Sequence, residues 1–273
     1  MTTTKMNLNL PWLNAGDTHE VKCFFCDGQN PTEERLTFNV NGKELKIIRC
    51  ATDDIMFLSP QPGQKYAESL YNHPSYYEGV NDMYGLAVND EKSQEIAKIR
   101  INEILKYKPD AKSILEIGCG FGHTLDEALK NNFEIAEGVE FSQEAIKICK
   151  GKKLEVRQGS IQNPFSNFPK TKYDVIAMFS VLEHVENPEA FLKGVEKNMN
   201  PHGIFVIRVP EMSPEGPWLS LLDHNWHFTK KSLENLLLKI NFKVVDVFPS
   251  GIFHGIQHPG SLQSITVIAK LNE

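Results

Sequence analysis

Apolar and polar residues alternate with two different periods along the chain, and both periods are clearest after residue 90. Short apolar runs predict strands at 113–117, 135–139, 154–157, 173–179, 204–209, 244–248 and 265–269. Amphipathic patterns predict helices at 91–106, 123–131, 142–151, 188–199 and 229–240. Strands that alternate with helices form a mostly parallel sheet covered on both faces, so we expect a doubly wound α/β domain. The last two strands are joined by a long loop without a helical pattern, and we expect them to pair antiparallel.

The first part of the chain has a different texture and contains three of the five cysteines. The segment 36–48 has alternating apolar residues around Asn41-Gly42, a pair that strongly favours a hairpin turn. A tyrosine-rich stretch and the first helix follow. We therefore expect three parts: a small cysteine-containing segment at 1–65, a tyrosine-rich lid with the first helix at 66–110, and the main α/β domain at 111–273.

The charge balance excludes one class of partner. Lysine and arginine number 29 against 35 acidic residues, a formal net charge of −6, so no basic stripe is present to neutralise nucleic-acid phosphates. No apolar run approaches the roughly 18 residues that indicate a membrane-spanning helix. The first residues lack the apolar core of a secretory signal, and an odd number of cysteines argues against a disulfide framework. We expect a cytoplasmic protein whose partner is a small molecule. The oligomeric state stays open.

A glycine-rich loop follows the first strand of the α/β domain. Its sequence, Glu116-Ile-Gly-Cys-Gly-Phe-Gly122, has the spacing G-x-G-x-G and leads directly into a helix. Such a loop lets a ligand approach the backbone at the carboxyl end of a strand. A dinucleotide fingerprint needs a third small residue where this chain has His123. Glu140 ends the next strand, where a carboxylate can accept hydrogen bonds from a ribose. A bare strand-to-helix turn is the alternative, and it would require neither acid.

With these two segments the chain resembles class I methyltransferases that depend on S-adenosylmethionine (SAM). Segments similar to that family's motifs follow in the family's order, at 138–142, 156–161, 173–188, 200–207 and 226–237. The resemblance covers about residues 90–270. It implies a Rossmann-like seven-stranded sheet with an antiparallel last strand, and SAM as the cofactor. The chain departs from the family at Ser160, where an aspartate is usual, and at His202, which replaces one glycine of a turn.

The resemblance also assigns the residues that bind the cofactor. They are Glu116, Gly118, Gly120, Gly122, Glu140, Phe141, Ser160, Ile161 and Phe179. The sulfonium of SAM already activates the methyl group, so the protein's task is to hold an acceptor about 3–3.5 Å from it. A base is required only where the acceptor is a poorly acidic hydroxyl or a carbon.

Histidines are the candidate bases because their ordinary pKa suits proton transfer near neutral pH. His184 follows Glu183 just beyond the strand at 173–179, at the carboxyl edge of the sheet. In the fold that the chain resembles, this position is near the methyl group. We assign the catalytic residues as His184 first and His227 second, with Glu183 beside them. The alternative for His184 is that it only orders its loop.

The segment around Trp226 should border the acceptor pocket. His224 and Trp226 are its candidate residues, and Trp226 either lines the pocket or packs beneath it. In a helix, the spacing of three would place His224 and His227 on one face, where they could share a metal. Otherwise one imidazole lies in the pocket and the other is exposed. Tyr76 and Tyr77 either close over the site or belong to a packed connecting arm.

Four residues of the N-terminal segment have the chemistry of a zinc site. Cys23 and Cys26 form a C-x-x-C-x-G knuckle, and Cys50 and Asp53 follow after the predicted hairpin. Zinc accepts thiolates together with a carboxylate in a tetrahedron. The segment resembles the zinc-binding, ribbon-like N-terminal part of certain bacterial sugar-type methyltransferases, although Asp53 stands where they have a fourth cysteine. The alternative is a vestigial knuckle whose thiols pack as small apolar groups.

These observations lead to one functional hypothesis and two alternatives. We expect SAM-dependent methyl transfer to a small polar metabolite, a saccharide or its conjugate, with oxygen as the acceptor atom and a histidine as general base. One alternative is methylation at nitrogen or carbon. The other is a catalytically silent scaffold that binds SAM and zinc, which the presence of both Glu116 and Glu140 disfavours.

Overall fold

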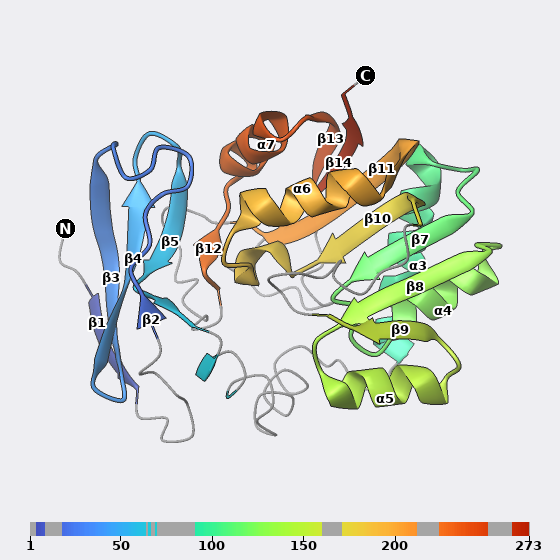
Figure 1. The fold of residues 1–273 in the computed structure, drawn as a ribbon, viewed down its shortest axis with the longest axis horizontal. Helices are drawn as coiled ribbons and strands as arrows, with labels where there is room; N and C mark the ends of the chain where they lie inside the picture. Colours follow the sequence, from blue (N-terminus) through green and yellow to red (C-terminus); the bar gives the residue numbers. More distant parts are fainter. Residues whose placement is uncertain are drawn as a thin grey trace.

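A seven-stranded sheet forms the centre of the computed structural model, which describes residues 4–8, 18–63, 65–66, 69, 91–159, 171–211, 224–250 and 264–272. Its strands are β7 (Ser113–Ile117), β8 (Ile135–Glu140), β9 (Glu155–Gln158), β10 (Tyr173–Phe179), β11 (Met199–Pro210), β13 (Phe242–Ser250) and β14 (Ser264–Leu271). The order is β13-β14-β11-β10-β7-β8-β9 (Figure 1). β7 to β11 are parallel, and β14 pairs antiparallel with both β11 and β13. The predicted doubly wound sheet with an antiparallel last strand is confirmed.

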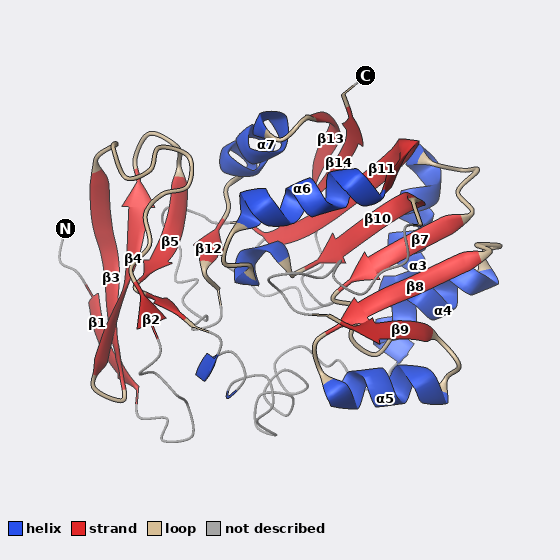
Figure 2. Cartoon of the chain, in the orientation of Figure 1, coloured by secondary structure: helices blue, strands red, loops and turns tan. Residues whose placement is uncertain are grey.

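Helices cover both faces of this sheet (Figure 2). One face carries α3 (Glu91–Tyr107), α4 (His123–Lys130) and α5 (Gln143–Gly151), and the other carries α6 (Pro188–Asn198) and α7 (Lys230–Lys239). Successive residues of β10 divide between the two resulting cores. Ile176 and Met178 join the core under α6 and α7, whereas Val175 and Ala177 join the core under the other three helices. The strand is therefore apolar on both faces, as expected of a covered parallel sheet.

β11 begins at Met199, well before the predicted start at 204, and α6 ends at Asn198. The predicted turn at 200–203 is instead a bulge inside the strand, because Tyr173 pairs with Met199 whereas Val175 pairs with Ile204. A Cβ on Gly203 would lie 3.0 Å from three backbone oxygens, so the bulge requires glycine there.

The N-terminal segment forms a second sheet. Its strands, in spatial order, are β1 (Thr4–Leu8), β3 (Thr32–Val40), β4 (Lys43–Cys50), β5 (Ile55–Ser59) and β12 (Trp226–His227). β2 (Thr18–His19) and β6 (Gln61–Pro62) form a small antiparallel pair beside it. β3 and β4 turn at Asn41-Gly42, which confirms the predicted hairpin. The last strand comes from the C-terminal part of the chain, so this sheet does not belong to the N-terminal segment alone.

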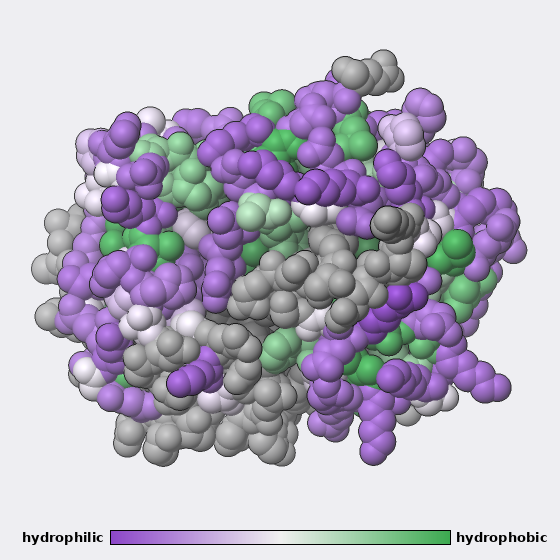
Figure 3. All heavy atoms as spheres, viewed as in Figure 1, coloured by the Kyte–Doolittle hydropathy of each residue, from purple (hydrophilic) through white to green (hydrophobic). Residues whose placement is uncertain are grey.

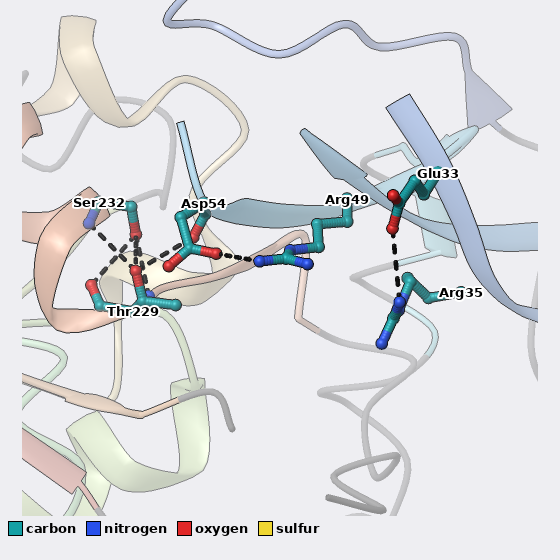
Figure 4. Close-up of polar contacts among 6 residues, drawn as sticks. All are labelled: Glu33, Arg35, Arg49, Asp54, Thr229 and Ser232. Atoms are coloured by element: carbon teal, nitrogen blue, oxygen red, sulfur yellow. Dashed lines mark hydrogen bonds and ion pairs between the residues drawn. The ribbon is translucent and has the colours of Figure 1, made fainter. Parts of the chain in front are cut away.

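Contacts around β12 join the second sheet to the α/β domain. Trp226 and Phe57 lie in one continuous core with residues of α6 and α7. Figure 4 shows the polar contacts at this junction. Thr229 Oγ1 donates a hydrogen bond to the backbone oxygen of Asp54 at 3.0 Å, and the Asp54 carboxylate pairs with Arg49 at 2.7 Å. The turn between β4 and β5 is thereby fixed to the start of α7.

Hydrophilic residues cover most of the described surface in Figure 3. The large apolar side chains that are exposed lie in different elements and include Leu129, Ile135, Leu238 and Val245. In the part of the chain that the structure describes, no helix is long and apolar enough to cross a membrane.

Candidate functional site

The glycine loop, residues 118–122, leaves the carboxyl end of β7 and enters α4. Gly118 and Gly122 have φ angles of +74° and +77°. A Cβ at Gly118 would lie 2.4 Å from Val181 Cγ2, and a Cβ at Gly122 would lie equally close to a leucine side chain. A Cβ at Gly120 would meet no described atom within 4 Å. The loop is therefore closely packed at its two ends and open at its middle.

The carboxylate of Glu140 holds the glycine loop from the neighbouring strand. Its Oε2 accepts a hydrogen bond from the backbone N–H of Gly120 at 2.8 Å. Its Oε1 accepts from the N–H groups of Phe141 and Ser142 at 2.7 and 2.8 Å. Ser142 in turn caps α5 through its side chain. One carboxylate thus fixes the ends of two strands and the start of a helix.

Glu116 is buried at the end of β7 and pairs with an arginine from α3. Its Oε1 lies 3.6 Å from Arg100 Nη1, which also donates to Thr124 Oγ1 at 3.2 Å. Burial raises the pKa of Glu116 to about 7, and the nearby Arg100 charge opposes that rise. Burial also lowers the pKa of Arg100 to about 10. Glu116 Oε2 and Arg100 Nε have no hydrogen-bond partner among the described residues, so the pair retains unused polar atoms.

Two guanidinium groups lie against the ring of Phe179, the last residue of β10. Arg100 is 4.0 Å and Arg208 is 5.4 Å from its centroid, so cation–π attraction helps to hold both. Arg208 is also bound by Glu103 at 3.1 Å and by Thr266 at 3.0 Å. Phe179 was predicted from the sequence, but neither arginine was. A single arginine on an amphipathic helix indicates a solvent contact, and nothing in the helical pattern distinguished Arg100 from the other charged residues of α3.

Beyond β10, a short 3₁₀ turn, η1 (Leu182–His184), brings Glu183 and His184 next to two histidines from a distant segment. Glu183 Oε1 lies 4.0 Å from His184 Nε2 and 4.0 Å from His224 Nε2. The ring centroids of His184 and His224 are 4.7 Å apart, and those of His224 and His227 are 5.8 Å apart. We call these four residues the imidazole cluster. His227 lies in a strand and His224 just before it, so the helix considered for this pair does not form.

Hydrogen bonds fix the two halves of the imidazole cluster to one another. Asn225 Nδ2 donates to the backbone oxygen of His184, and Trp226 Nε1 donates to that of Val185, both at 2.8 Å. Trp226 is 1% exposed, and its ring contacts those of Phe24 and Phe57. Of the two roles considered for Trp226, its contacts are those of packing beneath the site.

Burial controls protonation in the imidazole cluster. Removal from water lowers the pKa of His224 well below its ordinary range and that of His227 to about 4, and the neighbouring His184 adds to both effects. His184 is the most accessible member, with 13% of its side chain exposed. His227 Nε2 has no hydrogen-bond partner among the described residues. At neutral pH the two buried imidazoles are therefore uncharged, and each keeps a nitrogen lone pair.

The imidazole cluster and the glycine loop share one edge of the sheet. β10 lies next to β7, and both strands end at this edge because they are parallel. Val181, which immediately precedes η1, is the residue that excludes a side chain at Gly118. The turn that carries Glu183 and His184 therefore begins beside the glycine loop.

The four residues predicted as a zinc site also come together, and we call them the cysteine cluster. The thiols of Cys23 and Cys50 donate to Asp53 Oδ2 at 3.5 and 3.1 Å, and the sulfurs of Cys26 and Cys50 are 3.9 Å apart. All four ligand atoms lie within 4.8 Å of one another. In a tetrahedral site with Zn–S bonds of about 2.3 Å, sulfur atoms are about 3.8 Å apart. The cluster therefore fits zinc, and its cysteines form no disulfide.

Four further predicted residues lie outside the described part of the chain: Tyr76, Tyr77, Ser160 and Ile161. The remaining predicted residues lie in the glycine loop, at the ends of β7, β8 and β10, in the imidazole cluster with the neighbouring Trp226, and in the cysteine cluster.

A family model described as a methyltransferase domain matches residues 90–247. The ubiquinone biosynthesis O-methyltransferase of Vibrio atlanticus is 26% identical over 117 residues, which cover 40% of this chain and 48% of that protein. The mitochondrial ubiquinone biosynthesis O-methyltransferase of Schizosaccharomyces pombe is 34% identical over 105 residues, 35% of this chain and 37% of that protein. The chain therefore matches about half the length, or less, of these curated relatives.

Solved structures show the same fold. The 1,6-didemethyltoxoflavin-N1-methyltransferase of Burkholderia thailandensis, with 1,6-didemethyltoxoflavin and S-adenosylhomocysteine bound, has a TM-score of 0.56 at 17% identity, over 73% of this chain and 85% of that one. A SAM-dependent methyltransferase from Archaeoglobus fulgidus has a TM-score of 0.55 at 19% identity, over 71% of this chain and 99% of that one. At these identities the likeness shows the fold alone.

The buried neutral histidines predict a loss of stability in acid. In the unfolded chain a histidine takes up a proton below about pH 6.5, whereas His227 in the folded protein does so only near 4. His227 therefore leaves the free energy of unfolding unchanged above pH 6.5. As the pH falls from 6.5 to about 4, its low pKa reduces the free energy of unfolding by about 3 kcal/mol. Urea unfolding between pH 7 and 4.5 should show a shallower decline for His227→Gln than for the wild type. The exposed His202→Gln should keep the wild-type slope, and an equal decline in all three proteins would contradict the assignment.

Proposed function

Because the chain belongs to the family of methyltransferase domains and is a SAM-dependent methyltransferase, we propose that it methylates an oxygen of a small polar metabolite, a saccharide or its conjugate. The observation that carries the proposal is the position of the imidazole cluster and the glycine loop at one edge of the sheet, where Val181, the residue before η1, packs against Gly118. Relatives named as O-methyltransferases favour oxygen. The resemblance of the cysteine segment to sugar-type enzymes favours a saccharide.

The glycine loop and the acids beside it would hold the cofactor. SAM, when bound, supplies a methyl group on a positively charged sulfur. Glu140 accepts hydrogen bonds from the ribose hydroxyls while it keeps the Gly120 amide in place. Glu116 and Arg100 present Oε2 and Nε to the ammonium and carboxylate of the methionine part, since burial leaves these atoms without described partners. The resemblance also assigns Phe141, Ser160 and Ile161 to the cofactor, and Phe179 fixes Arg100.

The imidazole cluster would remove the acceptor's proton. A hydroxyl must lose its proton as the methyl group arrives, and an imidazole within reach can accept it. His184 is the first candidate because it is the most accessible member of the cluster, and His227 is the second. Glu183 orients His184 and supports positive charge on it across 4.0 Å.

The cysteine cluster would hold a zinc ion with a structural role. Its four ligand atoms have the separations of a tetrahedral zinc site, and all four coordination positions are filled by the chain, as is typical of structural zinc. Cys50 is the last residue of β4, and Asp53 lies in the turn that follows. Thr229 binds this turn through the backbone oxygen of Asp54. Zinc would therefore stiffen the turn that supports the acceptor side of the site.

The ribose role of Glu140 can be separated from its role in the loop. Glu140→Ala should weaken S-adenosylhomocysteine binding at least tenfold, since it removes a charged acceptor worth about 1.5–3 kcal/mol. Calorimetry with the 2′-deoxy form of the ligand supplies the second arm. The wild type should prefer the hydroxylated ligand, and the variant should bind both forms equally. A preference of the same size in both proteins would exclude a contact between Glu140 and the ribose.

Turnover separates proton transfer from positioning. With a panel of saccharides and their conjugates, His184→Ala should lower kcat by about 10²–10⁴-fold and change SAM affinity only a few-fold. The acid limb tests His227 as the base, because its pKa of about 4 would sustain the rate to low pH. Exposed His202→Ala is the control.

Near-full turnover in both His184→Ala and His227→Ala would exclude a histidine base and favour an amine acceptor. No SAM consumption with any acceptor, including cell extract searched for methyl mass shifts, would favour a silent scaffold.

Metal analysis tests the cysteine cluster. The purified protein should contain about one zinc per chain, and Cys26→Ser and Asp53→Asn should lower that content. Asp54→Asn is a matched control, because Asp54 is adjacent in sequence but pairs with Arg49 instead of the cluster. Asp53→Cys should retain zinc with higher affinity. Wild-type protein prepared with added zinc and found metal-free would favour the vestigial knuckle.

A further inference from the structure

We propose that Glu183, His184 and His224 bind a divalent transition-metal cation, and that this cation binds the acceptor oxygen beside the SAM site. The second half of the proposal rests on the proposed O-methylation, whereas the first half does not. The site is separate from the cysteine cluster, and its ligands come from two segments of the chain. Glu183 and His184 belong to η1, and His224 precedes β12.

The three ligand atoms surround a common point. Glu183 Oε1 is 4.0 Å from each of the two Nε2 atoms, and the three residues each offer one ligand atom within 4.8 Å of the other two. A separation of 4.0 Å is too long for a hydrogen bond. Zinc bonds to an imidazole nitrogen or a carboxylate oxygen are about 2.0–2.2 Å long, so the ligand atoms of a tetrahedral site are about 3.4 Å apart, roughly 0.6 Å closer than they are here. A cation placed between the atoms would therefore reach ordinary bond lengths after small movements of the side chains.

The chemistry of the ligand set suits such a cation. Two imidazoles and one carboxylate are typical ligands of divalent transition metals, and three protein ligands leave at least one position open. Glu183 and His224 are buried, at 1% and 6% exposure. A divalent cation would add a favourable charge beside the buried carboxylate of Glu183.

The surrounding contacts hold the ligands in place. Asn225 binds the backbone of His184, and Trp226 binds the backbone of the next residue, so η1 cannot move independently of the segment that carries His224. Hydrogen bonds around a metal site commonly orient its ligands in this way. The same edge carries the glycine loop, because Val181 packs on Gly118. An open coordination position here would lie on the side of the sheet where the methyl group is presented.

The cation would activate the acceptor directly. An acceptor hydroxyl in the open position becomes more acidic because its oxygen is bound to a positive charge. Its proton passes to His227, the member of the imidazole cluster that is left uncoordinated. The oxygen's electron pair then forms the bond to the methyl carbon, the sulfur–carbon bond breaks, and its electron pair returns to sulfur as a neutral thioether. With the cation bound, His184 is a ligand, and His227 takes the role of base.

Manganese(II) is a suitable probe of protein that holds one equivalent of zinc, because thiolates favour the softer zinc and keep it in the cysteine cluster while the Glu183, His184 and His224 site stays available to Mn²⁺. The disappearance of the free-ion electron paramagnetic resonance signal measures binding to the full-length protein. We expect about one Mn²⁺ per chain, and at least tenfold weaker binding in Glu183→Gln and in His224→Gln. Exposed His202→Gln should bind Mn²⁺ as the wild type does. Nitrogen hyperfine couplings in the wild-type spectrum should report imidazole ligands, a result that does not depend on the folding of any variant.

Two results would overturn the site: no Mn²⁺ bound by the wild type, or unchanged binding in Glu183→Gln together with a spectrum that lacks nitrogen couplings. Turnover with and without added Mn²⁺ separates this proposal from the proposed function. Bound Mn²⁺ with methylation only of amines would support the metal site and refute the oxygen acceptor. Methylation of hydroxyls that is unaffected by chelation would support the oxygen acceptor and refute the role of the cation.

Discussion

The pairing of β12 with β5 is the contact on which the rest of the site depends. Trp226 and His227 complete a sheet whose other strands lie between residues 4 and 59. The same segment donates hydrogen bonds to the last residue of η1 through Asn225 and to the residue after it through Trp226. On its other side, Thr229 binds the turn that follows the cysteine cluster. One short strand therefore holds the N-terminal sheet, η1 and the imidazole cluster in a single frame. A metal bound by the cysteine cluster would act on the acceptor side of the site through this frame, because β5 lies between them.

Local patterns sufficed to predict the elements of the main sheet. β7 and β10 have their predicted bounds, because each is a short apolar run covered on both faces and bounded by glycine, serine or lysine. β12 could not be predicted, since a strand of two residues carries no period and exists only through its partner β5. The predicted start of β11 at residue 204 was wrong for a related reason. Pairing with β10 stabilises the bulge in β11. Without that partner, a segment such as Pro201-His202-Gly203 is typical of a turn.

The candidate site divides in the same way. The glycine loop, Glu116 and Glu140 were identified because each stands at the end of a strand, a position that the sequence itself shows. Arg100 was missed, because its burial depends on the packing of α3 against β7 and β10 rather than on its neighbours in the chain. Glu183 and His224 were each singled out, but their approach to 4.0 Å depends on β12. Burial also determines the low pKa of His227, and no pattern in the sequence predicts it.

The carboxyl edge of the sheet contains buried polar atoms that the described residues do not satisfy, among them Glu116 Oε2, Arg100 Nε and His227 Nε2. Each such atom destabilises a fold by about 1–3 kcal/mol, so several at one edge are tolerated most readily where a ligand completes them. Burial raises the pKa of Glu116 to about 7 because its charge is poorly solvated there. An ammonium group placed beside Glu116 would supply the missing solvation and favour the ionised carboxylate. Binding of the cofactor and ionisation of Glu116 should therefore reinforce one another, and an edge that is unfavourable for the folded chain alone becomes favourable for a charged ligand.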